Sequence, residues 1–452
     1  NTYVLIIDAS KGFIKEGKNN KLRASDIKRI ADTFIKRESI PKFSRVVSRE
    51  EIRSNDYNLN IPRYVDSSEA AEHWDVYASM FGGIPTAEID EMSEFWTAFP
   101  ALKKALFTES GIPYVNVSVD DIKSAIKSHP DVVGFENAFN AAFSTFPAFL
   151  KEELIDRMGS IEISKAETVL SADIFERLKE IPLIDKYAAF QLLDDDWTGI
   201  SIDLEMLQTE GFAATKKVDP NLVIKKKDGK DQEVQEGWVG HIIPFDLVQA
   251  TLLSTETDEL HGLESRLAEI PSEYESILDE MTEEDKESCN DVLTEEGDAF
   301  VPKEVSKKIK ELKKDRSPES VALRTLLEKV ESLVKSEKEI KAEIKAKSAA
   351  LQAKTKDTIE SLSDEQALNL LEKKWIAPLI ESIHKLPDTV IDSLVSKIQA
   401  LQNKYATTFF EVEQQISETE ATLSGMIDDL EGNEYDMLGL NELKKLLGGS
   451  AE

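Results

Sequence analysis

Apolar residues recur at heptad spacing through the second half of the chain. The first series starts after about residue 246 and runs for four heptads, with further apolar positions between the repeats. Its members are Leu253, Leu260, Leu267, Tyr274 and Met281, with Leu263, Ile270 and Ile277 between them. The pattern predicts a long amphipathic helix that Pro271 would kink or interrupt.

Two more heptad series follow an acidic, glycine-containing stretch over 279–299, which predicts a loop or a short helical turn. A second helix is expected over about 303–360, with Leu323, Val330, Ile344 and Leu351 in phase and Glu337 as the lapse. The third series is Ile391, Leu394, Ile398, Leu401, Tyr405 and Val412. The apolar stripe then continues on the adjacent side of the helix with Phe409, Ile416, Leu423 and Leu430, as the drift of a heptad repeat around a long helix predicts. Such helices can fold back as an antiparallel coiled coil or bundle, or leave one seam open for a partner.

The first 66 residues have a shorter period and predict strand, helix, strand, short helix and strand. Val4–Ile7 predicts a buried strand, and residues 46–47 predict a second one. Residues 59–65 predict a third, half-buried strand in which Pro62 fits an edge or an end. Between the first two strands, Ser25 is expected to cap a helix whose apolar face is Ile27, Ile30, Ala31, Phe34 and Ile35. This order is typical of the end of an α/β sheet.

The middle of the chain contains an aromatic helical region and then a hairpin. Five phenylalanines step by four, four, three and three residues along one predicted helix face, at Phe135, Phe139, Phe143, Phe146 and Phe149. Core packing is favoured over a cofactor-stacking role. The hairpin is predicted by two strand-like runs around Asp228-Gly229, with a tip of Lys225, Lys226, Lys227 and Lys230. A solvated turn is favoured there over a phosphate contact.

The expected fold class is mainly α, with a small N-terminal α/β part and long heptad-bearing helices in the C-terminal half. We divide the chain into the end of an α/β domain (1–66), a helical domain (67–200), a hairpin-containing segment (201–245), long coiled-coil helices (246–430) and a C-terminal loop with a short helix (431–452).

Charge is divided unevenly along the chain. The net charge is −32, but residues 1–65 hold 14 Lys and Arg against 8 Asp and Glu. Any DNA contact is therefore expected near the N-terminus, because neutralising phosphates requires local positive charge. The single cysteine, Cys289, excludes an internal disulfide framework and favours a reducing compartment, the cytoplasm. No apolar run reaches the roughly 20 residues needed to span a membrane.

The sequence supplies no complete catalytic or metal site. Its five histidines are scattered without metal-ligand spacing, and Cys289 lies among acidic residues that disfavour a thiolate. The acidic clusters at 194–196 and 283–285 fit solvated turns better than a cation site. A basic run over 303–316 places Lys303, Lys307, Lys310 and Lys314 on one predicted helix face, where DNA or an acidic partner could bind. An exposed, solvated face is the simpler interpretation.

Several strings of residues resemble the modification subunits of type I restriction-modification systems, which are adenine-N6 DNA methyltransferase subunits. These strings are Val4–Ser10, Asn19–Leu22, Asn55–Asp66, Gln208–Leu222, Gly237–Pro244 and Gly432–Gly449. Such enzymes also need a glycine-rich turn for S-adenosylmethionine and an Asn/Asp-Pro-Pro-aromatic tetrad for the flipped adenine. Both motifs are absent here, and Asn60–Tyr64 is only superficially close to the tetrad.

The resemblance implies that this chain is the C-terminal portion of a modification subunit, cut after the catalytic core and inactive alone. It implies S-adenosylmethionine as the cofactor of the intact subunit, with none expected in this chain. The implied partners are a specificity subunit, a second modification subunit, a restriction subunit and double-stranded DNA. The implied role is subunit assembly and DNA clamping, with C-terminal helices against the helical spacers of the specificity subunit. No catalytic, cofactor-binding or metal-binding residue is predicted, and the candidates for DNA or subunit proximity are Asn58, Asn60, Arg63, Tyr64, Lys307, Lys310 and Lys314.

Two other functions are weaker alternatives. A free-standing coiled-coil structural protein would explain the heptads, but not the strings at 55–66 and 206–245. A nuclease that uses the acidic clusters has only non-specific support.

Overall fold

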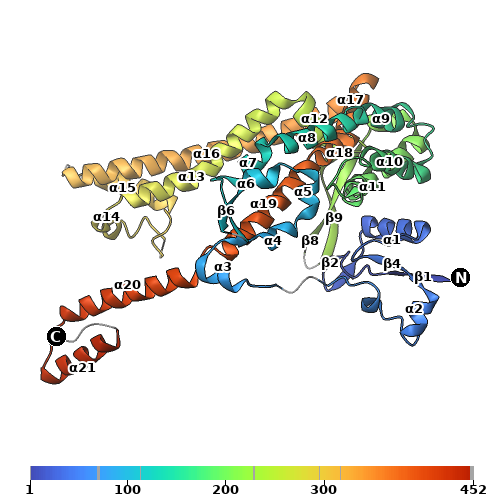
Figure 1. Cartoon of the computed structure of the whole chain (residues 1–452). Coiled ribbons are helices and arrows are strands. Elements are labelled where there is room, and N and C mark those ends of the chain that lie inside the picture. The colour runs from blue at the N-terminus through green and yellow to red at the C-terminus, as the bar shows by residue number, and fades with distance from the viewer. Residues whose placement is uncertain are drawn as a thin grey trace. The chain divides into compact units, whose positions relative to one another are not determined.

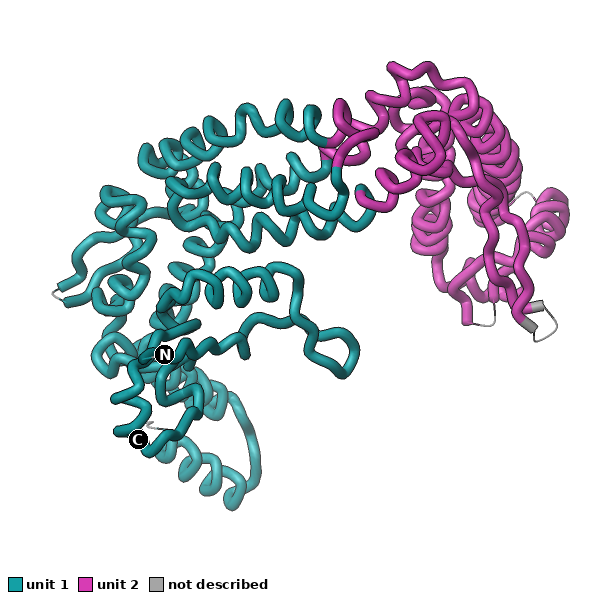
Figure 2. The backbone as a smooth tube through the Cα atoms, turned by 90° about the vertical axis from the view of Figure 1, so that its right-hand side faces the viewer, with its two compact units in different colours: residues 1–153, 162–200, 378–452 teal, residues 154–161, 201–377 magenta. Residues whose placement is uncertain are grey.

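The computed structural model describes residues 2–68, 72–111, 113–227, 230–294, 296–315 and 317–447. The chain forms two compact units (Figure 2). Unit 1 takes 1–153, 162–200 and 378–452, and unit 2 takes 154–161 and 201–377. The described residues are mostly helical, with several short strands near the N-terminus, which confirms the mainly α fold class (Figure 1). The division into five segments stays a prediction.

Unit 1 combines a small N-terminal α/β part with a larger helical part. Its strands are β1 (Tyr3–Ile7), β2 (Ile14–Glu16), β3 (Asn19–Lys21), β4 (Ser44–Ser48), β5 (Ile84–Pro85), β6 (Phe107–Gly111) and β7 (Tyr114–Val117). Its helices are α1 (Ala24–Lys36), α2 (Arg49–Ser54), the 3-10 turn η1 (Ile61–Arg63), α3 (Val76–Phe81), α4 (Thr86–Asp90), α5 (Ser93–Ala98), α6 (Leu102–Leu106), α7 (Ile122–Ser128), α8 (Pro130–Phe143), α9 (Phe146–Leu150), α10 (Ile163–Arg177), α19 (Leu386–Lys404), α20 (Phe409–Asp428) and α21 (Glu434–Leu446). Three further helical elements cross the unit boundary, the π-helix η2 (Lys151–Asp156), α11 (Lys186–Glu210) and α18 (Ala377–His384).

The N-terminal α/β part is built on an antiparallel pair of strands. β1 pairs with β4 from Tyr3 opposite Ser48 to Ile7 opposite Ser44, which confirms that the first two predicted segments are strands. The prediction that the first strand is buried is wrong, because only Ile6 of β1 is buried. Ile6 and Val47 of these strands form a small core with Ile52 of α2 and with Tyr64 and Val65, which follow η1.

The predicted third strand, over 59–65, is wrong. Asp56 and Tyr57 both have left-handed backbone conformations, with φ of 55° and 58°, and residues 61–63 then form η1. Two consecutive left-handed residues reverse the chain, and Pro62 in the first turn of η1 suits a helical turn. The tyrosine hydroxyl of Tyr64 donates to the carbonyl of Asn58 at 2.6 Å and closes the loop.

Helix α1 begins one residue before its predicted cap. Arg23 is the N-cap, and Ser25 lies inside the first turn with its backbone N–H donating to Gln191 Oε1 at 3.0 Å. The predicted apolar face is largely exposed, as described below.

The helical part of unit 1 has an aromatic core. Phe135, Phe139, Phe143 and Phe146 are each at most 6% exposed, which supports the core-packing interpretation. They lie on two helices rather than one, because the chain breaks between α8 and α9. Arg177 bridges this break, donating from Nη1 to the carbonyl of Ala142 at 2.7 Å and to Thr145 Oγ1 at 2.9 Å.

Unit 2 contains the hairpin and the long helices. Its remaining elements are η3 (Phe212–Lys216), β8 (Val218–Lys227), β9 (Lys230–Gly240), α12 (Phe245–Leu252), α13 (Ser254–Glu280), α14 (Glu283–Ser288), α15 (Pro302–Leu312), α16 (Pro318–Glu360) and α17 (Asp364–Trp375). β8 and β9 form the predicted antiparallel hairpin. The turn at 228–229 and the side chains of Lys227 and Lys230 lie outside the described residues.

The two longest helices of unit 2, α13 and α16, run antiparallel. Glu280 pairs with Lys329 at 3.2 Å at one end, and Glu259 pairs with Lys347 at 2.8 Å toward the other. Their apolar positions pack together, including Leu260 with Leu351 and Ile277 with Leu327. Knobs-into-holes packing of these helices stays a prediction.

The predicted long helices differ from the structure in two places. Pro271 does not interrupt α13, so of its two expected effects only a kink stays a prediction. The helix expected over 303–360 is two helices, because α15 ends at Leu312 and Ser317 caps α16. The third helix likewise divides into α19 and α20, where the side chain of Thr408 accepts from the N–H of Glu411 and caps the second helix.

The heptad lapse at Glu337 has a polar partner on α13. The hydroxyl of Tyr274, itself a heptad position, donates to Glu337 Oε2 at 3.1 Å. The pKa of Glu337 lies below its ordinary value, first because of the hydrogen bond from Lys341 and also because of that from Tyr274.

A buried ion pair joins α11 to α17 inside unit 2. Asp203 is 6% exposed, and its Oδ2 accepts from Lys374 Nζ at 2.5 Å and from Trp375 Nε1 at 2.7 Å. Lys374 also donates to the carbonyl of Ile242 at 2.6 Å. The Asp203 carboxylate thus accepts from the buried Trp375 and the partly buried Lys374, and Lys374 links this pair to the chain that follows β9.

His241 ties the base of the hairpin to the end of α11. Its Nδ1 lies 2.6 Å from Asp219 Oδ2, and its Nε2 lies 3.1 Å from Glu210 Oε1. Lys217 also pairs with Glu210. The hydrogen bond to Asp219 is the main reason that the pKa of His241 is raised.

We expect His241→Gln to destabilise unit 2 more at pH 5.5 than at pH 8.5. Because the folded pKa is raised, the contribution is fully present below the unfolded value of about 6.5 and is lost as the pH rises through the folded pKa. The expected loss at pH 5.5 is about 1–2 kcal/mol, as for a charge-assisted hydrogen bond. Thermal unfolding at both pH values would measure it, with exposed His261→Gln as the control. Equal losses at both pH values would contradict the proton-dependent bond.

Candidate assembly surfaces and DNA-proximal residues

The N-terminal α/β part of unit 1 exposes apolar side chains that its own small core does not cover. On α1, Ile27, Phe34 and Ile35 are 55%, 65% and 76% exposed. On β1, Tyr3 and Val4 are 55% and 41% exposed. The sequence pattern predicts this apolar face correctly, but within the described residues most of it remains in solvent.

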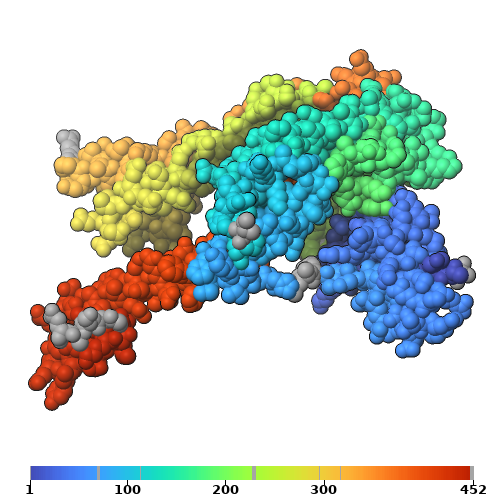
Figure 3. Space-filling view, in the orientation of Figure 1, coloured from blue at the N-terminus to red at the C-terminus, as the bar shows by residue number. Residues whose placement is uncertain are grey.

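A second group of exposed apolar side chains lies on α20 and α21. These helices form the red part of Figure 3. The exposed large side chains of α20 include Phe409, Ile416, Leu423 and Met426, and those of α21 include Tyr435, Leu438 and Leu446. Only Ser424 and Ile427 are buried on the described part of α20, and Lys444 of α21 pairs with Asp428 at 2.7 Å. The stretch 409–447 holds ten Asp and Glu against two Lys. It therefore combines an open apolar stripe with strong negative charge.

Partly buried polar contacts hold the point where α19 passes into α20. Lys404 Nζ donates to the carbonyl of His73 at 2.5 Å and to Glu88 Oε2 at 2.9 Å. The hydroxyl of Tyr405 bonds the same Glu88 carboxylate and accepts from the N–H of Asp75 at 3.1 Å. These contacts fix the start of α20 against the segment that precedes α3.

The candidate residues near 55–66 have different environments. Asn58 and Asn60 are exposed in the loop before η1, and the Asn58 side chain accepts from the N–H of Asn60 at 2.9 Å. Arg63 is exposed on η1. Tyr64 is 5% exposed and belongs to the N-terminal core, so its ring has little surface to offer a ligand. Proximity of these residues to DNA stays a prediction.

The basic candidates lie in unit 2. Lys307 and Lys310 are exposed on α15, and Lys307 pairs with Glu304 at 2.8 Å. Lys314 lies beyond the end of α15, so the predicted four-lysine face is not a single helix face. Arg316, part of the same basic run, lies outside the described residues. A role of these lysines in binding stays a prediction.

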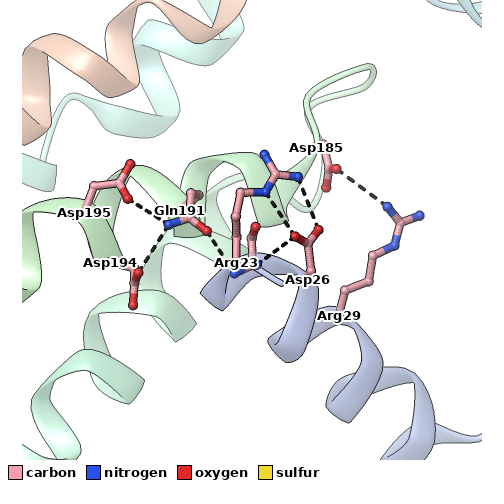
Figure 4. A network of polar contacts seen from close by, with 8 residues as sticks. Arg23, Asp26, Arg29, Asp185, Gln191, Asp194 and Asp195 are labelled. Atoms are coloured by element: carbon pink, nitrogen blue, oxygen red, sulfur yellow. Dashed lines mark hydrogen bonds and ion pairs between the residues drawn. The ribbon is translucent and has the colours of Figure 1, made fainter. Parts of the chain in front are cut away.

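Groups that could carry other chemistry are integrated into the fold. Cys289 is buried in the core around α13 and α16, and burial raises the pKa of its thiol. Asp194 and Asp195 accept hydrogen bonds from Gln191 (Figure 4). Among the described residues, no group of three or more His, Cys, Asp or Glu side chains could hold a metal ion.

The N-terminal strands do not fit S-adenosylmethionine. The methionine moiety needs a strand that passes through a glycine-rich turn into a helix. β1 leads into the β2–β3 hairpin, and β4 leads directly into α2 through Ser48, whose side chain accepts from the N–H of Glu51. Neither β1 nor β4 therefore passes through a glycine-rich turn into a helix.

Comparison with known proteins finds similarity in the first 73 residues of the chain. Residues 1–73 match the family described as N-6 DNA Methylase. The chain is 34% identical over 73 residues to the type I restriction enzyme MpnII methylase subunit of Mycoplasma pneumoniae. It is 43% and 40% identical over 76 residues to the MjaVII and MjaVIII methylase subunits of Methanocaldococcus jannaschii. No solved structure matches the chain.

These matches confirm the resemblance to type I modification subunits for the N-terminal segment. Each covers 16% of this chain and 13% of the relative. The strings at 206–245 and 430–449 lie beyond the matched residues. No described helix is both long and apolar enough to cross a membrane.

Proposed function

We propose that this chain is the C-terminal part of the modification subunit of a type I restriction-modification complex and serves in subunit assembly and DNA clamping. The observation that carries the proposal is the match of residues 1–73 to methylase subunits, on a segment that exposes its own apolar face. The intact subunit would transfer a methyl group from S-adenosylmethionine to adenine N6 in DNA, in the cytoplasm.

The exposed apolar side chains of α1 and β1 support the proposal that another part of the same subunit covers them. Leaving large apolar side chains in water forgoes about 25 cal/mol for each Å² that could be buried. Contiguous exposed apolar surface on a soluble protein marks a contact site. The rest of a methyltransferase sheet, with its cofactor site, is the neighbour that the matched family supplies.

The exposed apolar stripe on α20 and α21 supports the proposal that a helix of a partner subunit docks there. Apolar side chains at helical spacing on an exposed face suit docking against another amphipathic helix. Residues 409–447 hold ten acidic and two basic residues. This negative charge favours a partner whose apolar face is flanked by basic residues, because opposite charges steer association. We propose the helical spacers of the specificity subunit as this partner, with a second modification subunit and a restriction subunit completing the complex.

The test is co-purification of the full-length modification subunit with its specificity subunit. We expect Ile416→Glu combined with Leu423→Glu to weaken the complex at least tenfold, because each would bury a carboxylate against an apolar partner. Size-exclusion chromatography and a titration of the two subunits would measure the loss.

The matched control is Gln414→Glu combined with Ala421→Glu, which adds carboxylates on the opposite side of α20. This pair should leave the complex within about twofold of wild type. If both pairs weaken the complex equally, general repulsion is the cause. If neither does, α20 is not the contact.

A further inference from the structure

A polar cavity of about 430 Å³ lies in unit 1 beside the N-terminal strands. Its walls come from the end of β1, the start of α1, the loop before β4, residues 67–68 and the first turn of α11. The volume falls within the range of about 300–1,000 Å³ that is usual for small-ligand sites. Four cationic side chains line it, Lys11, Arg23, Arg29 and Lys42, against three carboxylates.

The carboxylates of the cavity already have hydrogen-bond donors. Asp8 accepts from the N–H of Ser10 at 2.9 Å and from the hydroxyl of Ser67 at 2.5 Å. Asp26 accepts two hydrogen bonds from the guanidinium of Arg23 and one from its backbone N–H (Figure 4). Asp185 accepts from the N–H of Tyr187 at 2.9 Å. The hydrogen bonds to Asp8 and Asp26 hold the pKa of both below the ordinary value, so both are ionised.

The cations, apart from Arg23, retain binding capacity. Arg29 Nε is buried without a hydrogen-bond partner in the described part of the chain, and Nη1 is 3.9 Å from Asp185, too far for a hydrogen bond (Figure 4). The guanidinium lies 4.5 Å from the centre of the Phe43 ring. Among the described residues, Lys11 and Lys42 form no ion pair within 4.0 Å. The Nε atom itself is out of reach of a ligand, but the Arg29 side chain is 37% exposed and lines the cavity, so its guanidinium can donate to an anion there.

We propose that this cavity binds a phosphate group, with Arg29, Lys11 and Lys42 as its cationic contacts. A guanidinium offers donors in a fork that matches phosphate, and flexible lysines neutralise the remaining charge. The phosphate belongs either to a DNA backbone, which rests on the proposed function, or to a small free anion, which does not.

The experiment measures two ligands with the full chain. Inorganic phosphate is titrated by calorimetry at constant ionic strength, and a short fluorescent DNA duplex is titrated by anisotropy at several salt concentrations. We expect Lys11→Gln and Lys42→Gln each to weaken phosphate binding about five- to tenfold. For a DNA phosphate, each should also lower the slope of log K against log salt by about 1. Lys36→Gln, an equal charge change on exposed α1 surface, is the matched control.

The outcomes separate the two sources. Loss of duplex binding in Lys11→Gln and Lys42→Gln but not in Lys36→Gln, with competition by inorganic phosphate, supports a DNA phosphate. Phosphate binding that the same two variants weaken, without duplex binding, supports a free anion. No phosphate binding, or equal weakening by Lys36→Gln, overturns the proposal. None of these results depends on whether the specificity subunit binds α20, so the two proposals fail separately.

Discussion

Asp203→Ala should destabilise unit 2 by about 3–5 kcal/mol. The substitution leaves the partly buried Lys374 ammonium with only the carbonyl of Ile242 and removes the acceptor of the buried Trp375 Nε1. The lost charge-assisted hydrogen bond costs about 1.5–3 kcal/mol and the unsatisfied, buried indole N–H costs about 1–3 kcal/mol, which together give the expected loss. Urea unfolding followed by tryptophan fluorescence would measure the shift in midpoint, since Trp375 is 1% exposed.

Asp364→Ala is the matched control for this prediction. Asp364 also pairs with a lysine of unit 2, Lys216 at 2.6 Å, but its side chain is 75% exposed. Exposed pairs contribute about 0–1 kcal/mol, so the midpoint should hardly move. Equal shifts for the two variants would mean that the Asp203 pair is solvated in solution.

Phe139→Ala should cost unit 1 about 3–5 kcal/mol. Phe139 is fully buried on α8, with its ring centre 4.7 Å from that of Phe143 and 6.1 Å from that of His384 on α18. Truncation removes the transfer free energy of the ring and leaves a cavity between helices that are distant in sequence. Urea unfolding followed by far-ultraviolet circular dichroism would report the loss.

Phe149→Ala tests whether burial or the aromatic ring itself sets that cost. Phe149 ends the same series of phenylalanines and stacks on Phe146, but it is only partly buried. Its loss should be less than half that of Phe139→Ala. A loss as large as that of Phe139→Ala would show that the exposed end of the series matters as much as the core.

The sequence predicts the elements of this fold better than their ends. Heptads at Leu253–Met281 and Leu323–Leu351 correspond to α13 and α16, because burial along one face outweighs local breaks such as Pro271. The breaks near residues 313–317 and 405–408 escape a pattern of apolar spacing, since capping by Ser317 and Thr408 sets them. The prediction of a strand at 59–65 is wrong because Asp56 and Tyr57, just before it, turn the chain in left-handed conformations. The alternation of apolar and polar residues gives no sign of this turn.

Of the candidate functional residues, the sequence could indicate only those that lie together in one short recognisable segment. Residues 55–66 could be recognised, but the string does not reveal that Tyr64 points into the core while Asn58 and Asn60 stay exposed. The cavity could not be found from the sequence. Its walls come from positions before residue 69 and around residue 187, which only the tertiary fold brings together.

The polar contact between Tyr274 and Glu337 gives the longest helix pair a unique alignment. Sliding α16 by one heptad would set the Glu337 carboxylate opposite Leu267 or Met281, neither of which can donate a hydrogen bond. The apolar positions alone would accept either shift, because they repeat. Glu337, which interrupts the heptad repeat, is therefore the residue that fixes the register of α13 against α16.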